Sequence, residues 1–317
     1  MVGVFGHSLS FPNKTPNRPP KPPMFSHHTR SVSLPCRSHP LVSQLKDSIS
    51  ELDKWSSSSS DNSSSSESTS PRTSAWLCAG LAQLRDVHDS LDDILQLPQT
   101  LETLSRHRQL VEKLLEDLLR FVDAYGIFWT SILALKEEQA AAQVAIRKKD
   151  EPRIGSYLQA LRKISREMHG LVSAIRSTGK SGMNIPIPTV GPDAELVTVI
   201  LSGVDVTVKV SIALFDGISA SFMLRKSSPW AGFSVSRKSE KTEKKAIDES
   251  IVELWEANVE RLLRGRLTKM KGEEVKMALK RMQEMESCIG VIEGGSERVF
   301  RSLISTRVSL LNSLTQR

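Results

Sequence analysis

The sequence has few cysteines and few aromatic residues, and each shortage excludes a class of protein. Only three of its 317 residues are cysteines, and they are widely scattered as Cys36, Cys78 and Cys288. Such a set cannot form a disulfide framework or a cysteine metal cluster, so we expect a reducing compartment. Aromatic residues make up 5% of the chain. Since leucine, isoleucine and valine recur throughout, this composition favours a helical protein over an aromatic-rich β-sandwich.

Motifs that carry catalysis or bind cofactors are also missing. The chain contains no G-x-S-x-G nucleophile elbow, no H-E-x-x-H zinc motif and no Rossmann fingerprint. The run Gly179-Lys180-Ser181-Gly182 lacks the full spacing of a phosphate loop and follows a predicted helix instead of a strand. We therefore expect a protein that is not an enzyme and that binds no cofactor.

The histidines offer little acid–base chemistry. Four of the seven lie within the first 39 residues, and none has metal-ligand spacing. His88 shares a predicted helix with Asp89 and Asp92. We expect these three residues to form an exposed, salt-bridged surface rather than an acid–base site.

The net charge of +7 is distributed unevenly. Residues 1–46 carry six Lys or Arg and no Asp or Glu, and residues 225–281 carry 15 basic and nine acidic side chains. Residues 47–224, in contrast, hold 18 basic and 23 acidic side chains. Neither basic segment has interleaved aromatics, zinc-finger spacing or an RNA-recognition motif, so we expect no specific nucleic-acid binding. A solvated or membrane-attracted basic surface remains as the alternative.

Composition divides the chain into four parts. Residues 1–37 predict a disordered basic tail rich in proline and serine, because prolines cannot donate regular backbone hydrogen bonds. Residues 38–55 predict a short amphipathic helix, and residues 56–72 a serine-rich linker that includes nine serines in residues 56–66. Residues 73–317 predict a helical bundle domain.

The tail holds one candidate partner motif. Arg30, Ser31, Ser33 and Pro35 have the spacing R-S-x-S-x-P, which is similar to a phosphoserine ligand of 14-3-3 proteins. Phosphorylation of Ser33 would add negative charge and three acceptor oxygens for an arginine cluster on the partner. The alternative is a coil that matches by composition alone. The tail also resembles an organelle transit peptide, because it contains serine and arginine but no acidic residue.

Apolar residues recur at helical spacing through the bundle domain. Residues 74–95 predict one helix that ends before Pro98, and residues 153–177 predict another. Between them, apolar residues step by three or four and predict a long coiled-coil-like helix with one buried stripe. The ten positions of that stripe are Leu101, Leu104, Arg108, Val111, Leu115, Leu118, Val122, Tyr125, Trp129 and Ile132.

Residues 193–224 are the most apolar run. Asp205, Lys209 and Asp216 interrupt it, so we expect a buried bundle helix rather than a transmembrane span. Residues 225–246 predict an exposed basic connection, beyond which helical spacing resumes at residues 247–262, 275–292 and 299–314. Gly294 and Gly295 leave open whether the last two form one helix. Together these patterns predict an all-α fold, an elongated antiparallel helical bundle with a disordered N-terminal tail.

Three segments in order resemble the plant BYPASS-related family: Arg30–Val42, Leu91–Pro98 and Arg298–Asn312. This resemblance spans about residues 27–317. It implies a plant protein of a group linked to root and shoot development, one member of which restrains a root-derived mobile signal. Cys36 stands where serine is commoner in the family. The resemblance transfers no catalytic residue.

Two classes of function remain. The first is a cytoplasmic, non-enzymatic helical regulator or scaffold that binds protein partners and is phosphorylated at Ser33. The second is a plastid-associated or peripherally membrane-associated factor that influences the production or transport of a small signalling molecule.

Overall fold

The structure, a computed structural model, describes residues 39–57, 72–180, 191–223, 249–258 and 267–315. All of them belong to one compact unit, Ser38–Arg317. These residues form helices and no strand, which confirms the predicted all-α helical bundle. The elements are α1 Pro40–Ser57, α2 Ser74–Leu95, α3 Pro98–Arg106, α4 Arg108–Lys148, α5 Glu151–Lys180, α6 Pro192–Phe222, α8 Val252–Ala257, a 3₁₀ turn Leu267–Lys269 and α10 Gly272–Thr315.

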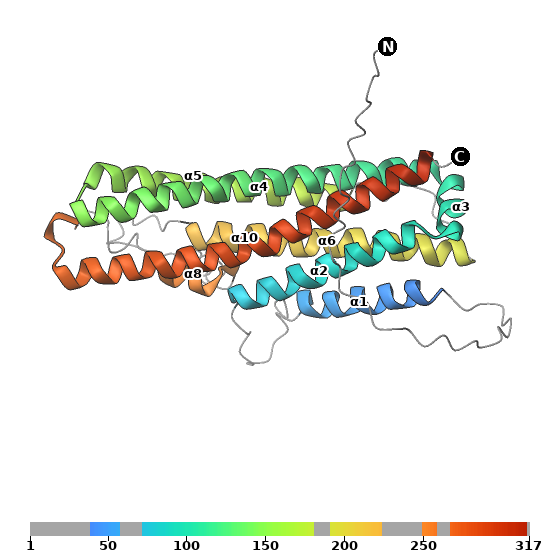
Figure 1. The fold of residues 1–317 in the computed structure, drawn as a ribbon, viewed down its shortest axis with the longest axis horizontal. Helices are drawn as coiled ribbons and strands as arrows, with labels where there is room; N and C mark the ends of the chain where they lie inside the picture. Colours follow the sequence, from blue (N-terminus) through green and yellow to red (C-terminus); the bar gives the residue numbers. More distant parts are fainter. Residues whose placement is uncertain (1–38, 58–71, 181–190, 224–248, 259–266, 316–317) are drawn as a thin grey trace, which may run out of the picture. The chain divides into compact units, whose positions relative to one another are not determined.

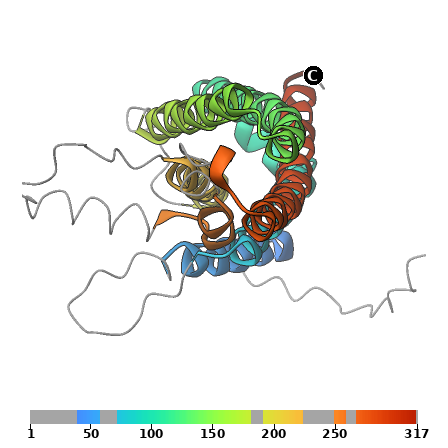
Figure 2. The ribbon, with the colours of Figure 1, turned by 90° about the vertical axis from the view of Figure 1, so that its left-hand side faces the viewer.

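Long helices run side by side in this unit (Figure 1). Helix α10 packs along both α2 and α4, and Figure 2 shows it between the α4–α5 pair and the α1–α2 pair. Helix α6 packs against α5, α2 and α1. The predicted tail, residues 1–37, the basic connection, residues 225–246, and most of the predicted linker lie outside the described residues.

The predicted stripe through residues 101–132 is only partly right. The chain leaves helical geometry at His107 (φ −114°, ψ 55°), so α3 and α4 are separate helices. Within α4, Trp129 and Arg108 are exposed, although the stripe placed both in the seam. The buried side chains also step by three and four and include four of the predicted positions, but Leu114, Phe121 and Phe128 are buried in place of Leu115, Val122 and Trp129. They are Val111, Leu114, Leu118, Phe121, Tyr125, Phe128, Ile132 and Leu135.

Helix α10 continues through Gly294 and Gly295 without a break. A Cβ at Gly295 would lie 3.1 Å from Leu81 Cδ1 and 3.9 Å from Cys78 Sγ, both on α2. The glycine therefore lets α2 and α10 approach closely, and the intrahelical hydrogen bonds outweigh its weak helix propensity.

Helix α6 lies in the core as predicted, and its charged residues sit at the edges. Lys209 forms ion pairs with Asp205 and with Asp53 of α1, and Asp216 pairs with Arg176 of α5 at 2.9 Å. These pairs satisfy the charges that interrupt the apolar run. The helix therefore buries its apolar faces without burying an unpaired charge.

Helix α1 packs on α2 and α6 through an apolar stripe and one tryptophan. Its buried residues are Val42, Leu45, Ile49 and Leu52. The Trp55 indole stacks on Trp76 with ring centroids 4.2 Å apart, and its Nε1–H donates to the Trp76 carbonyl at 3.0 Å. This contact ties the C-terminal end of α1 to the first turns of α2.

Candidate functional site

The four residues of the predicted phosphoserine motif, Arg30, Ser31, Ser33 and Pro35, lie outside the described residues. The site that the structure does describe surrounds His88, and sequence reasoning placed this residue wrongly. His88 is only 2% exposed, on the core side of α2, instead of on a salt-bridged surface. The signal for burial was present in the sequence, because Leu84, His88 and Leu91 continue the 3–4 stepping of the buried α2 residues.

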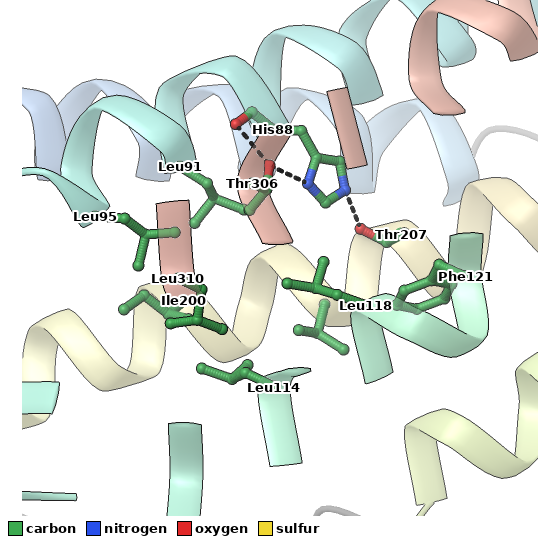
Figure 3. A pocket seen from close by; sticks show the side chains of 11 residues that line it. His88, Leu91, Leu95, Leu114, Leu118, Phe121, Ile200, Thr207, Thr306 and Leu310 are labelled. Carbon is green, nitrogen blue, oxygen red and sulfur yellow. Dashed lines mark hydrogen bonds between the residues drawn. The ribbon is translucent and has the colours of Figure 1, made fainter. Parts of the chain in front are cut away.

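The His88 ring joins three helices (Figure 3). Its Nε2 lies 2.9 Å from Thr207 Oγ1 on α6, and its Nδ1 lies 3.3 Å from Thr306 Oγ1 on α10. Thr207 donates its own proton to the Gly203 carbonyl at 2.7 Å. The hydroxyl of Thr207 therefore accepts from the imidazole, and Nε2 carries the ring hydrogen.

The second threonine completes the arrangement. Thr306 Oγ1 lies 3.0 Å from the Ser302 carbonyl and 3.3 Å from the His88 carbonyl, so one hydroxyl proton is placed among several acceptors. A neutral imidazole with its hydrogen on Nε2 presents Nδ1 as one of them. Burial lowers the pKa of His88 from 6.5 to about 4, because the low-dielectric interior disfavours the imidazolium. His88 is therefore neutral at physiological pH and links α2, α6 and α10.

The expectation of an exposed, salt-bridged surface is right for Asp89, which is exposed and pairs with Arg85 at 3.8 Å. Asp89 and Asp92 also fasten the surface between α2 and α10. Ser302 donates to Asp89 at 2.6 Å, and Ser305 donates to Asp92 at 3.2 Å. In the described part of the chain, the imidazole is hydrogen-bonded to the two threonines and to neither carboxylate. The cluster thus has no acid–base pair and acts as a set of polar ties across one helix interface.

A small cavity adjoins the ring. Its volume of about 20 Å³ is enough for one water molecule and too small for an organic ligand. The polar side chains of His88, Thr207 and Thr306 line one part of it (Figure 3). The remaining lining is apolar: Leu91, Leu95, Leu114, Leu118, Phe121, Ile200, Val204 and Leu310.

The depressed pKa of His88 predicts a pH-dependent stability. The unfolded chain takes up a proton on this histidine near pH 6.5, whereas the folded chain does so only near pH 4. The contribution of His88 to the free energy of unfolding is therefore fully present above pH 6.5. As the pH falls toward 4, about 3 kcal/mol of it is lost. Denaturant titrations from pH 7 to 4 should show this loss in the wild type.

The comparison variant for this prediction is His88→Gln. Its side-chain amide supplies an N–H donor in place of the imidazole N–H, but it cannot titrate. Carboxylates and the other histidines titrate equally in both proteins. The difference between the two unfolding free energies should therefore narrow as the pH falls from 6.5 to 4. A constant difference would show that His88 does not become protonated on unfolding.

The described cysteines and carboxylates do not form a metal site. Within the described ranges, no group of three or more His, Cys, Asp or Glu side chains is placed to hold a metal ion. Burial raises the pKa of the Cys288 thiol to about 12 and also raises that of Cys78. Both thiols are therefore poor nucleophiles at neutral pH.

Two helices are long and apolar enough to cross a membrane by length and composition. They are α4 and residues Asp193–Phe222 of α6, and about half of each apolar window is buried inside the bundle. The apolar side chains of α6 are mostly buried. Helix α4 differs, because Leu119, Ile127, Trp129 and Leu133 are exposed on its outer side.

Comparison with known proteins identifies a family for this chain. A family model described as Protein BPS1 matches residues 80–312. The matched segment begins in α2 and ends in α10, so it contains His88, Thr207 and Thr306. No curated protein and no solved structure matches the chain.

Proposed function

The chain belongs to the BPS1 family, a plant developmental family, and from this premise we propose that it acts as a non-enzymatic helical scaffold in root and shoot development. The match covers most of the chain and agrees with the resemblance to the BYPASS-related family. In this proposal the bundle presents fixed surfaces to protein partners, and the N-terminal tail regulates when they bind.

The geometry of His88 carries this proposal. His88 is a buried imidazole, the side chain most often used for acid–base catalysis, yet both ring nitrogens face threonine hydroxyls on neighbouring helices. Its neighbouring cavity has room for one water. An imidazole in this setting stabilises a defined helix arrangement, which a scaffold needs to keep its outer surfaces in place.

Regulation through Ser33 is the second part of the proposal. A phosphate on Ser33 carries a charge of about −1.5 to −2 and can form charge-assisted hydrogen bonds with an arginine cluster. Arg30 supplies the basic residue three positions earlier, and Pro35 follows two positions later. Since these are the features of a 14-3-3 ligand, a 14-3-3 protein is the partner that we propose for the tail.

Binding of a 14-3-3 protein should require phosphorylated Ser33. The full chain phosphorylated in vitro should bind, while Ser33→Ala treated in the same way should bind at least about tenfold more weakly, a loss of about 1.4 kcal/mol. Isothermal titration calorimetry would measure both affinities. Ser31→Ala is the matched control because it removes a neighbouring serine and leaves the phosphate acceptor. Equal binding by Ser33→Ala and the phosphorylated wild type would rule out this motif.

Proximity labelling in root tissue tests the scaffold role itself. The bundle should label a reproducible set of proteins, and Ser33→Ala should lose only those that depend on the phosphorylated tail. The His88→Gln variant should retain the labelled set at temperatures where it stays folded. If His88→Gln abolished function in plants without unfolding the protein or changing its partners, a chemical role for the imidazole would replace this proposal.

A second candidate function is a plastid- or membrane-associated factor that restrains a root-derived mobile signal. The length and apolar composition of α4 and α6 favour it, and so does the acid-free N-terminal tail. A C-terminal fluorescent fusion distinguishes the two candidates. Import into plastids with removal of the tail would support the second, whereas a full-length soluble protein that retains Ser33 would support the first.

A further inference from the structure

Helix α4 carries two apolar seams, and the second is only partly covered, because its Leu115 and Val122 are half-buried against the core while its other apolar side chains are exposed. The inner seam, with Phe121, Tyr125 and Phe128, faces the core. On the outer side, a second set of residues repeats with steps of four and three, the spacing that brings two helices together in a coiled coil. We call it the outer seam: Leu115, Leu119, Val122, Gly126, Trp129 and Leu133. Leu119 is 41% exposed, Trp129 49% and Leu133 37%.

Helix α10 extends this apolar surface. Lys136 pairs with Glu293, and Gln143 donates to Glu286, so α4 and α10 run antiparallel in a fixed register. That register sets position 124, the midpoint of the outer seam, level with position 305 of α10. Three of the exposed apolar residues of α10, Ile304, Val308 and Leu311, lie close to this level. The two sets therefore belong to one stretch of the bundle.

We propose that the outer seam binds a second copy of this chain, with the two α4 helices antiparallel. A two-fold axis at the midpoint sets Leu115 opposite Leu133 of the second copy, Leu119 opposite Trp129, and Val122 opposite Gly126. The seam residues alternate between the a and d positions of a heptad. Each of these contacts between the two copies then pairs an a position with a d position, as in an antiparallel coiled coil. Gly126 has no atom within 4 Å of a Cβ position, so it leaves room for a side chain of the second copy.

The exposed area agrees with an interface between copies. Six of the exposed apolar side chains lie near this level, and together they present roughly 500 Å², while a stable interface buries about 800 Å² per partner including its polar rim. They are Leu119, Trp129 and Leu133 of α4 and Ile304, Val308 and Leu311 of α10. A patch of this size is comparable to the largest apolar patch of a typical monomeric protein, about 300–600 Å², and such patches are often binding sites. Antiparallel self-pairing would bury both halves of it at once.

The charges beside the seam favour a protein over a membrane. Within the described part of the chain, neither Asp123 nor Glu137 has an ion pair, and both lie along the exposed side of α4. An anionic bilayer attracts lysine and arginine and repels carboxylates. In the antiparallel register, Asp123 also lies near Asp123 of the second copy, so this charge weakens the dimer slightly and specifies where the axis must pass.

Sedimentation equilibrium of the full chain over about 1 to 100 µM tests the proposal. The wild type should form a dimer in this range. Trp129→Glu should dimerise at least about tenfold more weakly, because it buries a charge in the seam. Asp123→Asn should dimerise more tightly than the wild type, because it removes the like charge at the axis.

Val291→Glu is the matched control. Val291 is 53% exposed on α10, but it lies on the α2 side, where its carbonyl accepts from the Cys78 thiol at 3.7 Å. This variant should dimerise like the wild type, and circular dichroism should show equal helix content in all four proteins. A wild type that stays monomeric throughout the range would overturn the proposal, as would equal losses in Trp129→Glu and Val291→Glu. A monomer that floats with anionic vesicles through Trp129 would assign the seam to a membrane instead.

Discussion

Replacing Phe215 by alanine is expected to lower the free energy of unfolding by about 3 to 5 kcal/mol. Phe215 is fully buried on α6. Its ring meets Tyr125 edge-on with centroids 5.7 Å apart and lies at the same distance from Phe128, tilted by 47°. Both partners are on α4, so this aromatic group connects α4 with the central α6. Its removal would leave a cavity between them.

The loss of unfolding free energy in Phe215→Ala should exceed the transfer free energy of the removed ring atoms. The reason is that the aromatic partners are rigid and cannot move to fill the cavity. The Tyr125 hydroxyl is also held by Ser211, one turn from Phe215, at 3.3 Å. Chemical denaturation would report the loss as a lower midpoint with an unchanged slope. Phe215→Leu, which keeps most of the volume, should cost clearly less. Equal unfolding free energies for Phe215→Ala and the wild type would contradict this account of the core.

Substitution of Gly80 by alanine should displace Trp55 and loosen α1. A Cβ at Gly80 would lie 2.2 Å from Trp55 Cζ2 and 2.6 Å from Cη2, well inside van der Waals contact. The indole would have to leave its stack on Trp76 and give up its hydrogen bond to the Trp76 carbonyl. We expect a cost of about 2 to 3 kcal/mol and a red shift in tryptophan fluorescence, since overpacking and a lost aromatic pair act together.

A matched glycine separates this steric effect from helix propensity. Gly170 lies exposed in the middle of α5, and no atom lies within 4 Å of the position that a Cβ would take. Gly170→Ala should therefore raise the free energy of unfolding by up to about 1 kcal/mol. A double-mutant cycle gives the second control. In a Trp55→Ala background the Gly80→Ala change should lose its cost, because the ring that it displaces is already gone. If the cost persisted there, another contact would be responsible.

The sequence predicted most of the helices because their signals are local. Helix α2 covers residues 74–95 as expected, with Thr73 as its N-cap accepting from Trp76 N–H at 3.1 Å and Pro98 opening the next helix. The core role of α6 also followed from composition, since three charged residues in an apolar run can pair at its edges. Periodicity alone was thus enough for class and element type.

Other features depended on contacts between distant parts of the chain. The spacing within α2 places His88 on the buried side, but its hydrogen-bond partners are distant in the chain: Thr207 is 119 positions away and Thr306 is 218 positions away. Trp129 and Phe128 are both aromatic neighbours in one helix, and only the position of α10 and α6 decides which of them faces the core. Gly295 fits within a continuous helix because Leu81 approaches it. None of these outcomes is encoded within one helical turn.

The candidate sites divide in the same way. The Ser33 motif is a linear pattern, so sequence alone defined it as a hypothesis, together with the plant family and the absence of recognised catalytic motifs. Tertiary structure decided that His88 is a neutral tie between helices and that the outer seam of α4 is only partly covered. The physical reason is that local backbone propensity and hydrophobic spacing specify a helix, whereas burial and pKa depend on which other helices pack against each face.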